Sequence, residues 1–171
     1  GHPWVRDVTI SNSTFGNRYV RLTHPRQGVH ALGGGIGQGI SMGIGAALAT
    51  DGPKAITLLG DGGAMLGLAE AITAVEERAP LVYVLMNDQA YGVIENIQDA
   101  QYDGRRHYSK LAVPEFDRFC ASIGLPHVRV ADVAGFAPAL DAALEADGPQ
   151  LIEVDMTAIG PFAEAFAGPP A

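Results

Sequence analysis

The chain contains little of what several large classes of protein require. Its single cysteine, Cys120, leaves no partner for an internal disulfide and suits a reducing compartment. Polar residues and glycines interrupt every apolar run before it reaches the length of a transmembrane helix, so no membrane span is expected. The first residues show no basic segment followed by an apolar core, so we expect no secretory signal and a cytoplasmic location.

Basic residues are also scarce. There are 11 Lys and Arg against 19 Asp and Glu, which gives a formal net charge of -8. The densest basic patch is the short stretch Gly104–Arg106. A surface that binds a nucleic-acid backbone needs a broad positive face, so a nucleic-acid partner is not expected.

What the chain does contain is enough apolar sequence for one core. Hydrophobic residues make up 47% of the 171 positions, which excludes a disordered chain. No internal repeat and no low-complexity linker divides the sequence. We therefore expect a single domain over residues 1–171.

Strand-like and helix-like segments alternate along the chain. Five segments have the length and apolar content of strands: Asp7–Ser11, Ala55–Gly60, Leu81–Met86, His127–Val130 and Gln150–Met156. Helices are predicted over Ile36–Ala49, Pro114–Ile123 and Phe136–Ala146, and for the face formed by Met65, Leu68, Ala69, Ile72 and Val75. This alternation predicts an α/β fold, with a mainly parallel sheet between two layers of helices.

The stretch "GDGGA" (Gly60–Ala64) lies where a buried strand passes into a helix, which is where parallel sheets bind ligands. A P-loop is excluded because no Gly-Lys pair occurs in the chain. The dinucleotide fingerprint fails as well, since position 65 is Met where Gly or Ala is needed. Asp61 could serve as a helix N-cap, a common use of aspartate, or as a ligand for a hard cation.

A cation needs a second oxygen ligand, and the next buried strand ends in "NDQAYG" (Asn87–Gly92). Positions 63–86 put 24 residues between Gly62 and Asn87, which is enough for one helix and one strand. A single crossover of that size brings Asp61 and the Asn87–Asp88 pair to adjacent strand ends. The spacing therefore favours a metal site over a simple cap.

Together these features resemble the thiamin-diphosphate motif of the decarboxylase and acetolactate synthase superfamily. The resemblance covers essentially the whole chain, which looks like the C-terminal diphosphate-binding domain. The glycine-rich turn in Gly33–Ala49 resembles the corresponding turn of the family, and the tail from Ala158 is similar to the ends of such enzymes. Ser11–Thr14 lies where benzoylformate-decarboxylase-like members carry a Ser/Thr pair.

The resemblance implies a site for thiamin diphosphate and Mg²⁺. It implies that Asp61, Asp88 and the main-chain carbonyl of Ala90 ligate the metal. Asp88 departs from the usual asparagine and adds a negative charge beside the diphosphate. The residues implied to contact the cofactor are Thr14, Gly34, Ile36, Gly60, Gly62, Gly63, Tyr91 and Gly92. Among these, Gly34 would offer its carbonyl to the aminopyrimidine, and Ile36 would enforce the bent cofactor conformation.

The implied activity is decarboxylation of a 2-oxo acid, followed by release of an aldehyde or ligation to a second carbonyl. His30 is a candidate base near the reacting end, although a strand-end histidine is the simpler interpretation. The family's catalytic glutamate belongs to a pyrimidine-binding domain that this sequence lacks. We therefore expect a fragment or subunit of a larger enzyme, completed by that domain of the same or a neighbouring chain in a homodimer or homotetramer. The alternatives are a non-catalytic binding or assembly module and an unrelated phosphate-binding enzyme.

Overall fold

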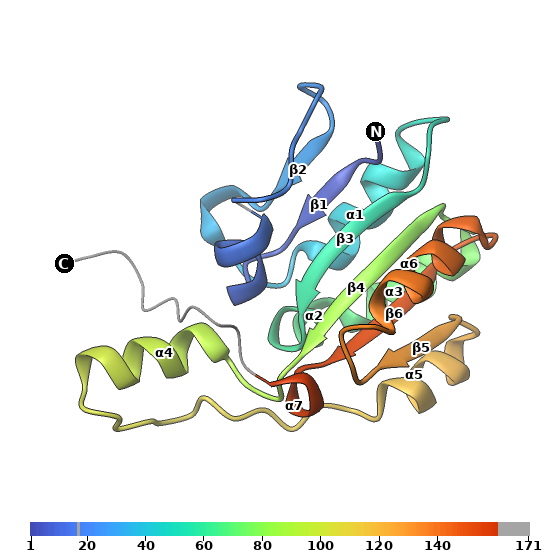
Figure 1. Cartoon of the computed structure of the whole chain (residues 1–171). Helices are drawn as coiled ribbons and strands as arrows, with labels where there is room; N and C mark the ends of the chain where they lie inside the picture. The colour runs from blue at the N-terminus through green and yellow to red at the C-terminus, as the bar shows by residue number, and fades with distance from the viewer. Residues whose placement is uncertain (17, 161–171) are drawn as a thin grey trace.

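The computed structural model of the chain describes residues 1–16 and 18–160, which form a six-stranded, wholly parallel sheet in the order β2-β1-β3-β4-β6-β5 (Figure 1). The strands are β1 (Trp4–Arg6), β2 (Gly28–His30), β3 (Ala55–Gly60), β4 (Leu81–Asn87), β5 (His127–Val130) and β6 (Gln150–Asp155). The α-helices are α1 (Gly39–Leu48), α2 (Asp61–Gly67), α3 (Ala71–Glu76), α4 (Gly92–Gln101), α5 (Phe116–Ile123), α6 (Phe136–Glu145) and α7 (Met156–Ile159). Three short helical turns are η1 (Asn12–Gly16), η2 (Leu32–Gly34) and η3 (Leu68–Glu70).

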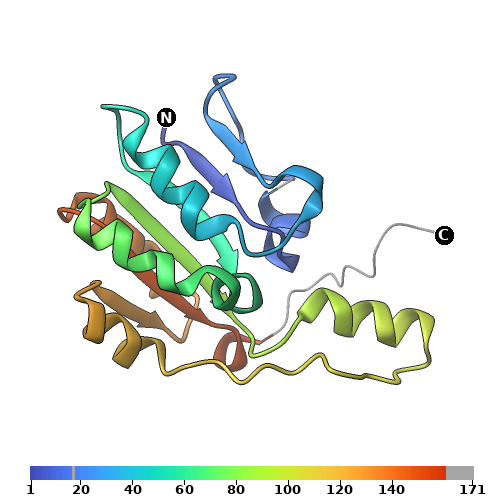
Figure 2. The same ribbon diagram turned by 180° about the vertical axis from the view of Figure 1, so that it is seen from behind.

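Helices cover both faces of the sheet, which confirms the predicted three-layer α/β/α arrangement. One apolar cluster joins α1, α2, α3 and α5 to the first face, and these helices lie in front in Figure 2. A second cluster joins α6 and α7 to the opposite face. The central strands β3 and β4 are buried on both sides, and their side chains contribute to both clusters. Because both faces of these strands are buried, their sequences are almost unbroken runs of apolar residues.

The predicted strand over Asp7–Ser11 is wrong. The strand is β1, which ends at Arg6, and the chain turns into a helical segment at Ile10. The amide of Asp7 still donates to the carbonyl of Leu58 on β3, at 3.0 Å, but its carboxylate then accepts from amides outside the sheet. The strand β2 was not predicted either, because three residues are too few to show the alternating apolar pattern of a strand.

The single helix predicted over Met65–Val75 is two helices, α2 and α3, separated by η3. Its predicted apolar face is confirmed only in part: Leu68 and Val75 pack against the core, whereas Met65 is 39% exposed and Ile72 is 46% exposed. Small residues of α3 belong to the core cluster, including Ala71 and Ala74, which are almost fully buried. Alanines let the helix approach the strands more closely than larger side chains would allow. The helix α4 was not predicted at all.

Cys120 lies in α5 and has no exposed surface. Burial, with the nearby negative charge of Glu153, raises the pKa of the thiol to about 12. Because only the thiolate reacts quickly, we expect no reaction with an exposed-thiol reagent such as DTNB at pH 8 until the chain unfolds. A stoichiometric colour change in 6 M guanidinium, and none in buffer, is the expected result. Rapid reaction in buffer would contradict this placement of α5.

Within residues 1–16 and 18–160, no helix is long and apolar enough to cross a membrane.

Candidate functional site

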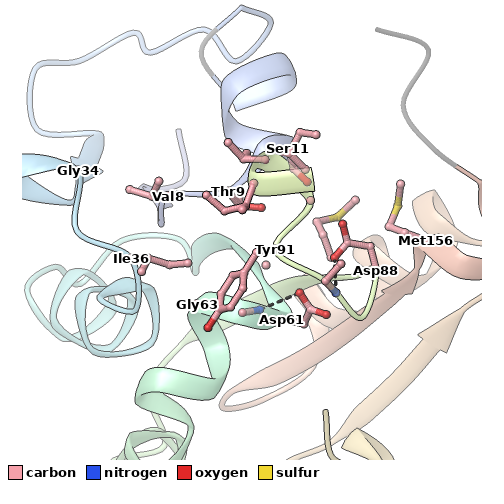
Figure 3. A pocket seen from close by; sticks show the side chains of 18 residues that line it. Val8, Thr9, Ser11, Gly34, Ile36, Asp61, Gly63, Asp88, Tyr91 and Met156 are labelled. Carbon is pink, nitrogen blue, oxygen red and sulfur yellow. Dashed lines mark hydrogen bonds between the residues drawn. The ribbon is translucent and has the colours of Figure 1, made fainter. Parts of the chain in front are cut away.

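A cavity of about 450 Å³ opens at the carboxyl ends of the strands (Figure 3). Its walls come from the segment after β1, the glycine turn before α1, the start of α2, the loop after β4, the start of α4, and α7. The lining residues are Val8, Thr9, Ile10, Ser11, Gly34, Ile36, Gly60, Asp61, Gly62, Gly63, Met86, Asp88, Ala90, Tyr91, Gly92, Val93, Ile94 and Met156. A ligand cavity in this position is typical of a parallel α/β sheet.

The glycines of "GDGGA" are required by close packing around the cavity. A Cβ atom on Gly62 would lie 2.5 Å from the ring of Tyr91, and one on Gly63 would lie 2.7 Å from a carboxylate oxygen of Asp7. A Cβ atom on Gly60 would likewise lie 2.8 Å from the hydroxyl oxygen of Thr9. Backbone therefore forms this wall of the cavity, and a ligand can approach the main chain directly.

Two carboxylates, those of Asp61 and Asp88, lie at the same wall of the cavity (Figure 3). Asp61 is 1% exposed; its Oδ1 accepts from the amide of Gly62 at 2.7 Å, and its Oδ2 is buried with no hydrogen-bond partner. Burial and then the negative charge of Asp88 raise the pKa of Asp61 to about 7. Burial also raises the pKa of Asp88. No basic side chain lines the described cavity, so this pair lacks a counterion there.

The structure does not support an N-cap role for Asp61. The N-cap position of α2 is Gly60, and Asp61 is the first residue inside the helix. Its carboxylate bonds the amide of the next residue rather than one further along the first turn, as a cap would.

This donor set fits a hard divalent cation that shares its coordination with a ligand. Asp61 and Asp88 supply carboxylate oxygens, and the main chain at Ala90 reaches the same cavity. Gln89 has a left-handed backbone (φ 55°), which turns the chain sharply between Asp88 and Ala90. The described residues include no group of three or more His, Cys, Asp or Glu placed to hold a metal. Mg²⁺ commonly takes only one or two carboxylates and completes its shell with phosphate oxygens and water, so the pair fits it.

The amide of Tyr91 is not open to a ligand. It donates to the carbonyl of Ser109 at 2.7 Å, and the amide of Leu111 donates to Gln89 at 2.9 Å. These two hydrogen bonds join the loop after β4 to residues 109–111, which follow α4 in the chain. Of the expected contacts in this loop, Tyr91 therefore offers its ring, while Gly92 begins α4 at the cavity wall.

The helix α4 projects from the carboxyl edge of the sheet, as Figures 1 and 2 show. The side chain of Glu95, on α4, binds the segment that runs back toward the sheet after this helix. This carboxylate is 9% exposed and accepts from Arg106 and Ser109, both at 3.0 Å, while Lys110 forms an ion pair with it at 3.2 Å. The basic stretch Gly104–Arg106 thus includes one residue, Arg106, that fixes the edge of the site.

The upstream glycine turn reaches the cavity as expected. Gly33, Gly34 and Gly37 have φ between 68° and 94°, a left-handed region that disfavours other residues. Gly34 and Ile36 both line the cavity, and the side chain of Ile36 is 40% exposed (Figure 3). A large apolar side chain left open at a cavity wall is suited to contact a ligand.

Among the predicted site residues, His30 is absent from the described lining of the cavity. His30 is the exposed last residue of the edge strand β2. Thr14 falls in η1, and its side chain lies outside the described part of the chain, as do residues 161–171 of the tail. Sequence reasoning missed the apolar walls at Val93 and Met156, which the family motif does not mark, and it missed Asp7.

Comparison with known proteins agrees with this geometry. Residues 9–154 match the family described as thiamine pyrophosphate enzyme, C-terminal TPP binding domain. The chain is 30% identical over 167 residues to a benzoylformate decarboxylase of Pseudomonas aeruginosa, covering 92% of this chain and 30% of that protein. It is also 30% identical over 146 residues to acetolactate synthase 2, chloroplastic, of Brassica napus, covering 80% of this chain and 23% of that protein.

A solved structure gives the same result for the fold. The thiamine diphosphate-dependent 4-hydroxybenzoylformate decarboxylase of Rhodococcus jostii RHA1 superposes with a TM-score of 0.82 and 27% identity. The match covers 90% of this chain and 29% of that one. The chain thus spans less than a third of the length of these relatives.

Proposed function

Because this chain belongs to the family of C-terminal TPP-binding domains of thiamine pyrophosphate enzymes, we propose that it binds the diphosphate of thiamin diphosphate through Mg²⁺. The observation that carries the proposal is the pair Asp61, which is buried, and Asp88, which is half-buried: two carboxylates at one cavity with no basic side chain among its described lining. Burying such a pair is costly unless a cation joins it.

Each wall of the cavity has a part in holding the cofactor. Asp61, Asp88 and the carbonyl of Ala90 would hold the metal, and backbone at Gly62, Gly63 and Gly92 would lie against the diphosphate. Apolar side chains on α4 and α7 would exclude water from the rest of the cavity. Ile36 would support the ring system from the glycine turn, and Gly34 would accept from its amino group.

The bound cofactor supplies an electron sink for decarboxylation of 2-oxo acids. We propose that the longer protein containing this chain is such a decarboxylase or a carboligase that joins the resulting fragment to a second carbonyl. The only acidic residues among the described lining are the two proposed metal ligands, so the described part of the cavity wall offers no further carboxyl group to the aminopyrimidine ring. We propose that the pyrimidine-binding domain of the same or a neighbouring chain supplies that group, and that the enzyme is a cytoplasmic homo-oligomer.

Calorimetric titration of thiamin diphosphate into this 171-residue chain tests the proposal. We expect binding with Mg²⁺, loss of binding with EDTA, and no binding of thiamin, which lacks the diphosphate. Equal binding with and without a divalent cation would contradict the role of the carboxylate pair. Binding of neither thiamin diphosphate nor inorganic diphosphate would favour a non-catalytic module over a cofactor domain.

A further inference from the structure

The carboxylate of Asp7 lies behind the cavity wall and is 1% exposed. Asp7 is not a lining residue, and no ion pair joins it to a basic side chain within the described residues. Such a buried carboxylate requires hydrogen-bond donors in place of water. Its donors are all backbone amides, and they come from the two segments that flank the cofactor cavity.

Three amides point at this carboxylate. Gly37 donates to both oxygens at 3.1 Å, and Gly39 donates to Oδ2 at 3.1 Å. Val8, the first lining residue after β1, donates to Oδ1 at 2.7 Å. The bonds to Gly37 and Gly39 bracket the end of the glycine turn, immediately after Ile36.

The glycine turn has few other means of keeping one shape. Gly33 and Gly34 have no heavy atom within 4 Å of where a Cβ would stand, and residues 33–36 are all exposed. Glycines in a left-handed conformation gain much conformational entropy on release. The helix that follows, α1, has no side-chain cap from its own N-cap residue, Gln38. Asp7 supplies that missing acceptor from a distant part of the chain.

Close packing fixes Asp7 against both neighbouring elements. A Cβ on Gly39 would lie 2.9 Å from the Cβ of Asp7, and one on Gly63 would lie 2.7 Å from its Oδ2. The carboxylate is therefore enclosed by the turn on one side and by the start of α2 on the other. Any movement of Asp7 would disturb the placement of Ile36.

We propose that Asp7 is a positioning residue, which orders the glycine turn so that Gly34 and Ile36 are held ready for the ring system of the cofactor. This inference rests on the proposed function for the identity of the ligand. The ordering of the turn can be observed without any ligand. Among the described residues, the hydrogen bonds of the Asp61 and Asp88 carboxylates come neither from Asp7 nor from the turn, so Asp7 should affect the ring end of the cofactor more than the diphosphate end.

The test compares wild type with Asp7→Asn, which keeps the size of the side chain but replaces one acceptor oxygen with an NH₂ group. Asp51→Asn, at an exposed turn residue, is the matched control. Hydrogen exchange of the Gly37 and Gly39 amides, measured without ligand, should be at least about tenfold faster in Asp7→Asn. Unchanged exchange overturns the proposal.

Titrations with Mg²⁺ and either thiamin diphosphate or inorganic diphosphate give the second readout. We expect Asp7→Asn to bind thiamin diphosphate about tenfold or more weakly, and inorganic diphosphate within about threefold of wild type. A merely structural role would weaken both ligands equally, and that result overturns the proposal, as does unchanged binding of both. If wild type binds neither ligand, the proposed function fails, whatever the exchange rates show.

A second variant covers the case in which Asp7→Asn does not fold. Gly39→Ala keeps the carboxylate but presses a methyl group against Asp7. The same faster exchange at Gly37 and the same selective loss of thiamin diphosphate binding are expected. Gly45→Ala, on the open side of α1, is its control, because nothing lies within 4 Å of that position and neither readout should change.

Discussion

Asp61→Asn should raise the stability of the ligand-free chain while abolishing Mg²⁺-dependent binding of thiamin diphosphate. The stabilisation follows from the burial of Asp61 beside a second, half-buried carboxylate, that of Asp88, at one cavity wall. Asparagine keeps an oxygen that can accept from the Gly62 amide, as Asp61 does at 2.7 Å, and it carries no charge. Substitution therefore removes both the desolvation cost and the repulsion from Asp88.

The stability gained by Asp61→Asn should increase with pH, because the pKa of Asp61 is raised in the folded chain. The pKa of Asp61 is raised from 3.8 to about 7 in the folded chain, so ionisation of this group costs the folded state more than the unfolded state. Between pH 4 and 7 wild type should therefore lose stability relative to Asp61→Asn, and above pH 7 the difference should level off. Its plateau should be on the order of 4 kcal/mol.

Urea unfolding at a series of pH values, in EDTA, measures this difference. Asp141→Asn, at an exposed position on α6, is the control and should match wild type throughout. Adding Mg²⁺ with thiamin diphosphate should stabilise wild type and leave Asp61→Asn unchanged, which reverses the order of the two proteins. A destabilised Asp61→Asn in EDTA at pH 8 would show that the carboxylate has a structural role and not a ligand-binding one.

The same pair of residues shows how far sequence could predict the site. The two carboxylates follow consecutive buried strands, and the register of β3 on β4 is set by long apolar segments, so spacing alone predicts that they meet. Asp7 gives no such signal. Its partners Gly37 and Gly39 are 30 and 32 residues away, and only the packing of β1 beside the glycine turn brings them together.

The errors in the predicted fold have a similar origin. The strand β2 is three residues long, and it is defined by its pairing with β1 rather than by its own sequence. The helix α4 has one buried residue, Glu95, whose partners lie in the returning chain, so its apolar period is weak. In α3 the alanines are buried in the core and Ile72 is not, because the space beside the helix, rather than hydrophobicity alone, decides which side chain fits.

Substitution of two glycines on α1, Gly43 and Gly45, should change the stability of the chain in opposite directions. Gly43 is buried against the sheet, where a Cβ would collide with Thr57 Oγ1 and lie 3.3 Å from the ring of Tyr83. Gly45 is exposed, and a Cβ there would meet nothing within 4 Å. One helix therefore supplies both the test and its control.

Gly45→Ala should stabilise the chain by about 0.5–1 kcal/mol, because alanine loses less backbone entropy in a helix. Gly43→Val should destabilise it by about 2–4 kcal/mol, since the larger side chain must push α1 away from β3. The hydroxyl of Tyr83 donates to the carbonyl of Ile40 on α1 at 3.2 Å, and this bond would be stretched by the same movement. Gly43→Ala should lie between the two.

For a chain of this size each kcal/mol shifts the melting temperature by about 2–4 °C, so thermal unfolding separates the variants clearly. The displacement should also reach the cavity, because α1 begins at Gly39, beside the carboxylate of Asp7. Faster exchange of the Gly39 amide in Gly43→Val, but not in Gly45→Ala, is the expected signature. Equal melting temperatures for Gly43→Val and wild type would mean that α1 does not pack on β3 as closely as described.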